Sequence, residues 1–188
     1  MDELELTDKF LSQIGINNQP MTQYSLGEKI AYVSMIASLA WADGSIDEKE
    51  LATVTAICKR ANIDDPKIIN AIIANTEKYD SNKYSRWTEL VKNTDLKYSL
   101  MADMFYTAFA NNVVHDSESV YMKYIAGKLD ISNEIYEKIR TTIEKEKGDN
   151  IEYEKVFYYT PPTPTQDMSA GFLSKGLKSM AQAVNSFF

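Results

Sequence analysis

Several residue types that often carry chemistry are scarce in this chain. Its 188 residues include a single cysteine, Cys58, and a single histidine, His115. A disulfide framework and a zinc site built from cysteine and histidine are therefore excluded within one chain. A nucleophile paired with a histidine base would have to use His115, and the sequence around it does not resemble a nucleophile turn. We therefore expect a protein that is not an enzyme.

Positive charge and long hydrophobic runs are also scarce. The chain has 20 basic and 27 acidic residues, a net charge of -7, and its first 150 residues contain no basic patch. Nucleic acid is therefore not an expected partner, because phosphate binding needs such a patch. The acidic start at residues 1–5 is unlike a secretory signal, and no apolar run approaches the ~18 residues of a membrane span. We expect a cytoplasmic protein, with peripheral contact to the inner membrane left open.

Glycine and proline number only seven and five, which disfavours many short strands joined by tight turns. At 44% hydrophobic residues, the composition suits a folded domain made mainly of helices. Apolar spacing, caps and breakers predict about seven helices in the first 150 residues. The seven expected helices cover residues 26–42, 47–58, 66–78, 87–91, 96–110, 116–129 and 133–147, and a short amphipathic segment at 1–14 precedes them.

The stretch from Ala42 to Glu50, ADGSIDEKE, carries the clearest chemical pattern. Its spacing reproduces the second half of an EF-hand loop, with Gly44 at the turn and Glu50 at the closing position. The first half is missing, because Leu39 and Trp41 stand where the first ligands would be.

Two interpretations of this motif stay open. In the first, Asp43, Asp47 and Glu50 bind a divalent cation, Ca²⁺ or Mg²⁺, weakly, with His115 and Glu118 as weaker candidates. In the second, Gly44 ends one helix and Asp47 with Glu50 forms a capping box at the start of the next. His115 and Glu118 then belong to an ordinary, solvent-exposed helix start.

The motif has a weaker copy 68 residues later in the chain. Ala42, Asp43 and Gly44 align with 110–112, where the sequence reads Ala-Asn-Asn, and Glu50 aligns with Glu118. Apolar positions also align, including Ile57 with residue 125 and Ile63 with residue 131. We therefore predict two pseudo-repeated helical hairpins packed in a two-fold-like manner.

The residues from Ala42 to Glu50, followed by Ile63-Asp64, resemble the first motif of the TerB-like tellurite-resistance family, and also the amino-terminal domain of DjlA co-chaperones. The resemblance covers about residues 25–147. It implies an all-α domain of about seven helices, a role in bacterial stress responses near the membrane, and acidic motif residues that hold a divalent metal. The second motif departs from the family pattern, because Asn111-Asn112 stands where Asp-Gly is typical.

The last 40 residues differ from the rest. We predict a TerB-like domain at 1–148, an extended segment and proline-rich linker at 149–170, and an amphipathic helix at 171–188. The apolar stripe of that helix would dock on a protein, either a second copy or another partner, or on a membrane surface. It consists of Phe172, Leu173, Leu177, Met180, Val184, Phe187 and Phe188.

The sequence therefore predicts a bacterial TerB-like scaffold or sensor of stress, with a weak cation site and a tail helix that binds a protein partner. The alternative is a purely structural interaction or assembly module without a metal, or an adaptor at the membrane surface.

Overall fold

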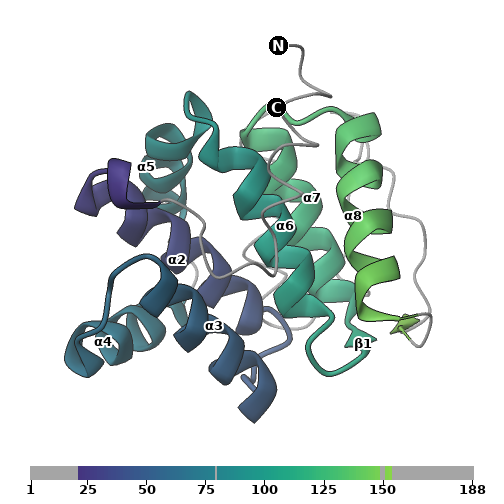
Figure 1. Ribbon diagram of the computed structural model, residues 1–188, viewed down its shortest axis with the longest axis horizontal. Coiled ribbons are helices and arrows are strands. Elements are labelled where there is room, and N and C mark those ends of the chain that lie inside the picture. Colours follow the sequence, from purple (N-terminus) through teal and green to yellow (C-terminus); the bar gives the residue numbers. More distant parts are fainter. Residues whose placement is uncertain (1–20, 79, 149–150, 154–188) are drawn as a thin grey trace.

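The structure, a computed structural model, describes residues 21–78, 80–148 and 151–153 (Figure 1). In these residues the elements are η1 (Met21–Gln23), α2 (Leu26–Ala40), α3 (Glu48–Arg60), α4 (Pro66–Thr76), α5 (Ser81–Lys92), α6 (Leu96–Ala108), β1 (Val113–Val114), α7 (Asp116–Lys128), α8 (Asn133–Lys147) and β2 (Glu152–Tyr153). The predicted all-α fold is confirmed. The amphipathic segment predicted at 1–14 and the tail helix predicted at 171–188 lie outside the described residues.

Local sequence signals explain where most of the helices begin. Ser25 and Glu28 form a capping box at α2, and Asp65 accepts a hydrogen bond from the Lys67 N–H just ahead of Pro66, the first residue of α4. These contacts satisfy N–H groups that have no partner within the helix. The helix predicted around residues 87–91 is longer than expected. It is α5, which begins at Ser81 because Asp80 caps it by accepting from the N–H groups of Asn82 and Lys83.

Two central helices organise the core. Every residue from Ala31 to Ala40 in α2 is buried, and in α6 the whole segment is buried except Lys97 and Tyr106. Helices buried on all sides must be covered by other elements. Helices α3, α4, α5 and α7 pack on α2, and α3, α5, α7 and α8 pack on α6, which also contacts α2 (Figure 1).

The predicted duplication is confirmed by the geometry of the two halves. Helix α7 begins and ends 68 residues after α3, and α6 ends 68 residues after α2. Left-handed backbone recurs at the same spacing, at Gly44 and Asn112 before the second helix of each hairpin and at Asn62 and Asp130 after it. The packing of α3 on α6 is matched by that of α7 on α2. Each half therefore contains a helical hairpin, and α4 and α5 lie between the two hairpins in sequence.

A polar network is buried between three helices of the core. The Tyr32 hydroxyl donates a 2.6 Å hydrogen bond to Asp103, and Arg60 forms an ion pair with the same carboxylate. Asp103 is 1% exposed. Burial and the Asp103 charge raise the pKa of Tyr32 well above its ordinary value, so its hydroxyl keeps its proton and serves as a donor. The network joins α2, α3 and α6.

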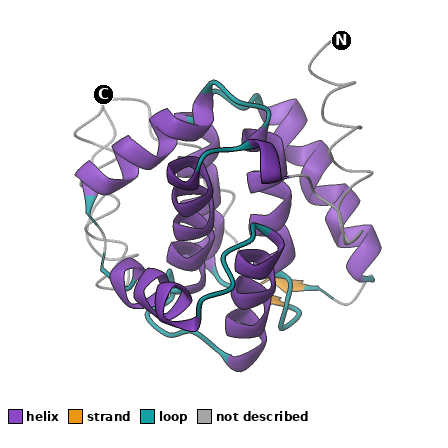
Figure 2. Ribbon diagram, turned by 60° about the vertical axis from the view of Figure 1, so that its left-hand side comes forward, coloured by secondary structure: helices purple, strands orange, loops and turns teal. Residues whose placement is uncertain are grey.

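In the described part of the chain, strand structure is confined to one short parallel pair (Figure 2). After α8 ends at Lys147, with Gly148 as its C-cap, β2 runs beside β1, with Val113 opposite Glu152 and Val114 opposite Tyr153. The Tyr153 ring packs edge-on against Phe109, with ring centres 6.3 Å apart. The segment after α8 is thus tied to the loop that precedes α7.

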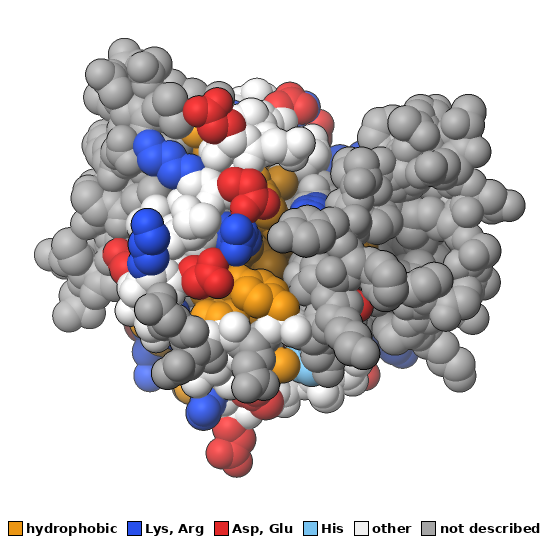
Figure 3. Space-filling view, turned by 90° about the vertical axis from the view of Figure 1, so that its right-hand side faces the viewer, with side chains coloured by type: hydrophobic (Ala, Val, Ile, Leu, Met, Phe, Trp, Pro, Cys, Tyr) orange, Lys and Arg blue, Asp and Glu red, His pale blue; other side chains and the backbone are white. Residues whose placement is uncertain are grey.

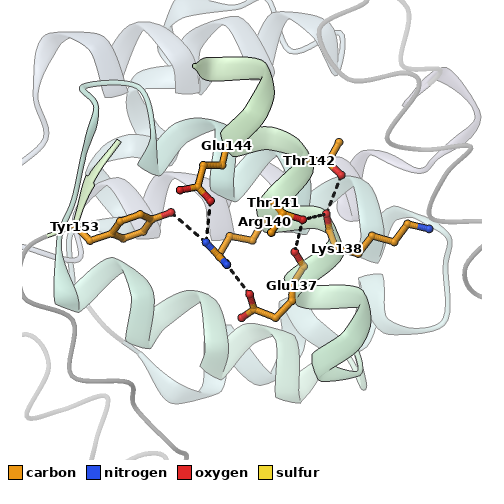
Figure 4. Close-up of polar contacts among 7 residues, drawn as sticks. All are labelled: Glu137, Lys138, Arg140, Thr141, Thr142, Glu144 and Tyr153. Atoms are coloured by element: carbon orange, nitrogen blue, oxygen red, sulfur yellow. Dashed lines mark hydrogen bonds and ion pairs between the residues drawn. The ribbon is translucent and has the colours of Figure 1, made fainter. Parts of the chain in front are cut away.

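Side chains of α8 also hold this segment (Figure 4). Arg140 donates to Glu137 at 2.7 Å and to Glu144 at 2.8 Å, one turn away on either side. Its guanidinium also lies 3.5 Å from the Tyr153 hydroxyl. The two acids fix the Arg140 side chain in the direction of Tyr153.

No helix in the described residues is both long enough and apolar enough to span a bilayer.

Candidate functional site

The two copies of the sequence motif meet in space. The first copy joins α2 to α3, and the second joins α6 to α7. Because α2 packs against α6, and α3 and α7 each pack against the opposite central helix, both turns come to the same end of the bundle. This arrangement is set by the duplication.

The first turn is built by hydrogen bonds from carboxylates to the backbone. Asp43 accepts from the N–H of Ser45 at 2.8 Å, which closes the turn at Gly44, whose φ is 99°. Asp47 then caps α3 by accepting from the N–H of Lys49 at 2.7 Å and of Glu50 at 2.8 Å. In return, Glu50 accepts from the N–H of Asp47 at 2.9 Å. The predicted capping box is present.

The second turn repeats this pattern with different residues. Asn111 accepts from the N–H of Val113 at 2.9 Å, and Asn112 adopts the positive φ, 66°, that glycine has in the first copy. Glu118 accepts from the N–H of His115 at 2.8 Å, as Glu50 does from Asp47. The backbone geometry is therefore retained although three of the four side chains have changed.

Two contacts join the turns to each other. The Asn111 side-chain amide donates a 2.7 Å hydrogen bond to Asp47 Oδ2. His115 Nε2 lies 3.5 Å from Asp43 Oδ2, which is an ion pair whenever the imidazole is protonated. The prediction that His115 is a solvent-exposed helix start is therefore wrong in one respect. Its side chain is 27% exposed and faces the other repeat.

The two closing glutamates are buried, which the sequence interpretation did not foresee. Glu50 is 5% exposed and Glu118 is 1% exposed. Burial raises the pKa of Glu50 to about 7 and that of Glu118 to about 9, and the nearby acids, Asp43 and Asp47 among them, add to both shifts. Glu118 Oε1 has no hydrogen-bond partner. Glu118 is thus a buried, neutral carboxylic acid at pH 7 and not an ordinary first-turn acid.

Asp47 has the opposite behaviour. Burial works to raise its pKa, but the N–H groups of Glu50 and Lys49 and the Asn111 amide donate to its carboxylate, and the pKa is lowered overall. Asp47 is therefore charged, while the two glutamates behind it hold their protons more tightly. Asp47 and the two glutamates therefore have pKa values shifted in opposite directions, down for Asp47 and up for Glu50 and Glu118.

The cluster does not fit a hard cation as it is folded. Ca²⁺ needs six to eight oxygen ligands that point to one centre. Both Asp47 oxygens accept hydrogen bonds from nitrogen donors, one Asp43 oxygen accepts from Ser45, and the other faces His115. Within the described residues, no three side chains of His, Cys, Asp or Glu are grouped so that they could hold a metal ion. Cation binding at Asp43, Asp47 and Glu50 stays a prediction.

Sequence reasoning missed Asn111 as a member of this cluster, because an asparagine in a degraded motif copy looks like a loss. The 68-residue alignment contained the signal, since it places Asn111 opposite Asp43 and His115 opposite Asp47 in the repeat. The alignment does not show that each residue contacts the counterpart of the other: Asn111 contacts Asp47, and His115 contacts Asp43. These contacts follow only from the packing of α2 on α6.

Comparison with known proteins gives one match. The family model described as tellurite resistance protein TerB matches residues 29–141, a range that includes both turns and most of both hairpins. No curated protein and no solved structure matches the chain.

Proposed function

Because the chain belongs to the TerB family of tellurite-resistance proteins, we propose that it is a non-catalytic scaffold or sensor in a bacterial response to tellurite and similar chemical stress. The observation that carries this proposal is the extent of the match, which covers both repeats and the buried interface between them. A domain with such a closely packed core is suited to present a surface, because its shape is fixed by packing.

The residues that an enzyme of this composition would use support a non-catalytic role. The Cys58 thiol is fully buried, and burial raises its pKa to about 11, so it is an unreactive core side chain. His115 contacts Asp43 across the repeat interface. The Nε2 atom of this imidazole therefore faces a carboxylate and not a Ser, Thr or Cys nucleophile.

We further propose that the C-terminal segment recruits a protein partner, either a second copy or another protein. Its predicted apolar stripe runs from Phe172 to Phe188 and lies outside the described residues. The described domain ends with β2, on the face that carries α8. Hydrophobic side chains are exposed there between acidic and basic ones (Figure 3), and Ile151 and Tyr153 are only partly buried. The described part of the chain therefore ends at a surface that offers apolar contacts.

A pair of variants tests the docking role. Met180→Glu places a charge in the predicted stripe, and Gln182→Glu places the same charge on the opposite side of the predicted helix. Sedimentation velocity of the full chain would show self-association. We expect Met180→Glu, and a form ending at Thr160, to abolish any assembly that Gln182→Glu retains. Equal behaviour of all four proteins, with no loss of tellurite resistance in cells, would contradict the proposal.

A cytoplasmic location with contact to the inner membrane surface is the corresponding proposal for localisation. It rests on the acidic body and on the apolar tail, whose two lysines, Lys175 and Lys178, supply little attraction to anionic lipid. Co-sedimentation with anionic liposomes, comparing the full chain with the form ending at Thr160, measures this contact. If both forms stay equally in solution, the tail acts on proteins only.

The second candidate function is a divalent-cation sensor, with Ca²⁺ or Mg²⁺ at Asp43, Asp47 and Glu50. One observation favours it: Glu118 Oε1 is buried and lacks a hydrogen-bond partner, which a bound cation would supply. Against it stand the nitrogen donors that already engage Asp43 and Asp47. If no cation binds, the acids serve only as helix caps, and the protein is a purely structural assembly module.

The scaffold proposal is tested in cells. In a strain from which the chromosomal copy is deleted, growth on tellurite would be compared after return of the wild type, of Met180→Glu and of Gln182→Glu. We expect the wild type and Gln182→Glu to restore growth and Met180→Glu to fail. Full resistance without any copy would overturn the stress-response assignment.

A further inference from the structure

The two contacts between the turns are formed by the same two positions of the repeat. In the 68-residue repeat, Asn111 is the counterpart of Asp43, and His115 is the counterpart of Asp47. Asp47 meets Asn111, and Asp43 meets His115. If the two halves are exchanged, each pair turns into the other. The turns are therefore related by a pseudo-two-fold axis, and the same two positions form the contact on both sides of it.

The chemistry on the two sides of this axis is different. The first repeat supplies an acid at both positions, and the second supplies a nitrogen-bearing side chain at both. Acids at both positions of both repeats would place two carboxylate pairs face to face, within about 3.5 Å of each other. Such a pair is stable only if it shares a proton or binds a cation between its oxygens.

We infer that the interface between the two repeats closes without a metal ion, because Asn111 and His115 occupy the places where a cation would otherwise be needed. The amide of Asn111 donates directly to Asp47 Oδ2 at 2.7 Å. His115 Nε2 takes the equivalent position beside Asp43 Oδ2 at 3.5 Å. The family resemblance implies a metal, so this chain's own residues disagree with that expectation.

The remaining oxygens of the turns are consistent with a protein-only closure. Asp43 and Asp47 each use one oxygen to accept backbone N–H groups of their own turn, and the other faces the opposite repeat. Asn111 makes the same double use of its side chain, since its carbonyl oxygen accepts from the Val113 N–H while its amide donates to Asp47. An aspartate at position 111 would keep the first contact and lose the second.

The proposed scaffold role is compatible with closure of the interface either with or without a metal ion. Closure without a metal ion goes beyond that role and has a functional consequence. A scaffold whose halves are held by side-chain nitrogen donors keeps its shape whatever the concentration of free Ca²⁺ or Mg²⁺. Chelation is therefore expected to leave its partner-docking surface unchanged.

The test replaces the two nitrogen donors by acids. Thermal unfolding of the full chain would be measured in EDTA and in excess Ca²⁺, Mg²⁺ or Mn²⁺, for the wild type and for the double variant Asn111→Asp/His115→Asp. A cation that binds only the native state raises its unfolding temperature. We expect the wild type to shift by less than about 1 °C, and the double variant to be less stable in EDTA and to regain about 5 °C or more with a cation.

A charge-matched control is available on α4. Asn70→Asp/Asn75→Asp adds two negative charges at exposed positions, and it should show no rise specific to a cation. A cation-dependent rise in the wild type that exceeds the rise in this control overturns the inference. So does a double variant that is indifferent to cations. If the double variant does not fold even with a cation, the single variant Asn111→Asp, which retains His115, is measured instead. It should be less stable than the wild type in EDTA and should gain stability with a cation, and indifference to cations overturns the inference.

Discussion

The Asn111 side-chain amide donates a 2.7 Å hydrogen bond to Asp47 Oδ2, across 64 residues of sequence and between the two halves of a duplicated fold. Asp47 is also the residue that caps α3. One carboxylate thus connects the start of a helix in the first repeat with the turn of the second, so local helix formation and the packing of the two halves reinforce each other.

A double-mutant cycle on these two residues should show strong coupling. Asn111→Ala, Asp47→Ala and the double variant would be compared by urea unfolding. We expect a coupling free energy of about 1 to 3 kcal/mol, since the hydrogen bond is made to a charged acceptor. Asn82→Ala, at an exposed position, is the control and should leave stability nearly unchanged and uncoupled to Asp47. Strict additivity of the Asn111 and Asp47 changes would mean that the contact contributes nothing.

The buried Glu118 predicts a loss of stability at high pH. Its pKa is about 9 in the folded protein, above the ordinary value of 4.5. Between these two values the folded state binds more protons than the unfolded state, so the free energy of unfolding falls as the pH rises. We expect that Glu118→Gln removes most of this fall and is more stable than the wild type at pH 8 by about 1 to 3 kcal/mol. Glu134→Gln, at an exposed first-turn acid of α8, should leave the profile unchanged.

Two glycines give opposite predictions for substitution by alanine. Neither has an atom within 4 Å of the place where a Cβ would stand, so space is not limiting at either position. Gly44 has a φ of +99°, and an alanine there is strained. Gly127 lies within α7, where alanine is the better helix former. In chemical denaturation, Gly44→Ala should cost about 1 to 2 kcal/mol and Gly127→Ala should gain up to about 1 kcal/mol. Equal effects would contradict the assigned turn.

The buried ion pair should contribute far more to the free energy of unfolding than the exposed one. Asp103→Ala leaves Arg60 without its partner between α2, α3 and α6, and we expect a loss of about 3 to 5 kcal/mol. Lys92→Ala removes the surface pair with Asp130, whose acid is 69% exposed, and the unfolding curve should not move measurably. A fully folded, equally stable Asp103→Ala protein would show that the Tyr32, Asp103 and Arg60 network is dispensable.

Tyr153 should anchor the segment after α8 through its ring more than through its hydroxyl. The ring packs on Phe109, whereas the hydroxyl lies 3.5 Å from Arg140, at the limit of a hydrogen bond. Tyr153→Phe should therefore change stability by less than about 0.5 kcal/mol, and Tyr153→Ala should lose about 1 to 3 kcal/mol. Amide hydrogen exchange at Val113 and Val114 would report the same order. Faster exchange in Tyr153→Phe than in Tyr153→Ala would contradict this assignment.

Much of the fold follows from local signals in the sequence. Ser132 and Gly148 bound α8 as predicted, and Asp65-Pro66 starts α4, because caps and breakers act within a few residues. The duplication was also predictable, since it repeats apolar positions at a fixed spacing. Helix α5 was predicted too short, because Asn82, Tyr84 and Ser85 have modest helix propensity and the helix is held by packing on α2.

The candidate site was less predictable for a physical reason. The sequence pointed to these acids as candidates, but burial decides their chemistry. Glu118 resembles any acid in the first turn of a helix, yet it is 1% exposed because α7 packs against both central helices. The contact between Asn111 and Asp47 depends on how α2 and α6 cross, which no local pattern encodes. Residues distant in the chain therefore determine which acids are charged and which nitrogen donors face them.

The most direct test of a metal-free closure is a crystal structure of the wild-type protein grown in Mn²⁺, with anomalous data collected at the manganese edge. We predict no anomalous peak between the turns, with the Asn111 amide within hydrogen-bonding distance of Asp47 and His115 beside Asp43. An anomalous peak coordinated by Asp43, Asp47, Glu50 or Glu118, with Asn111 displaced from Asp47, would contradict the account.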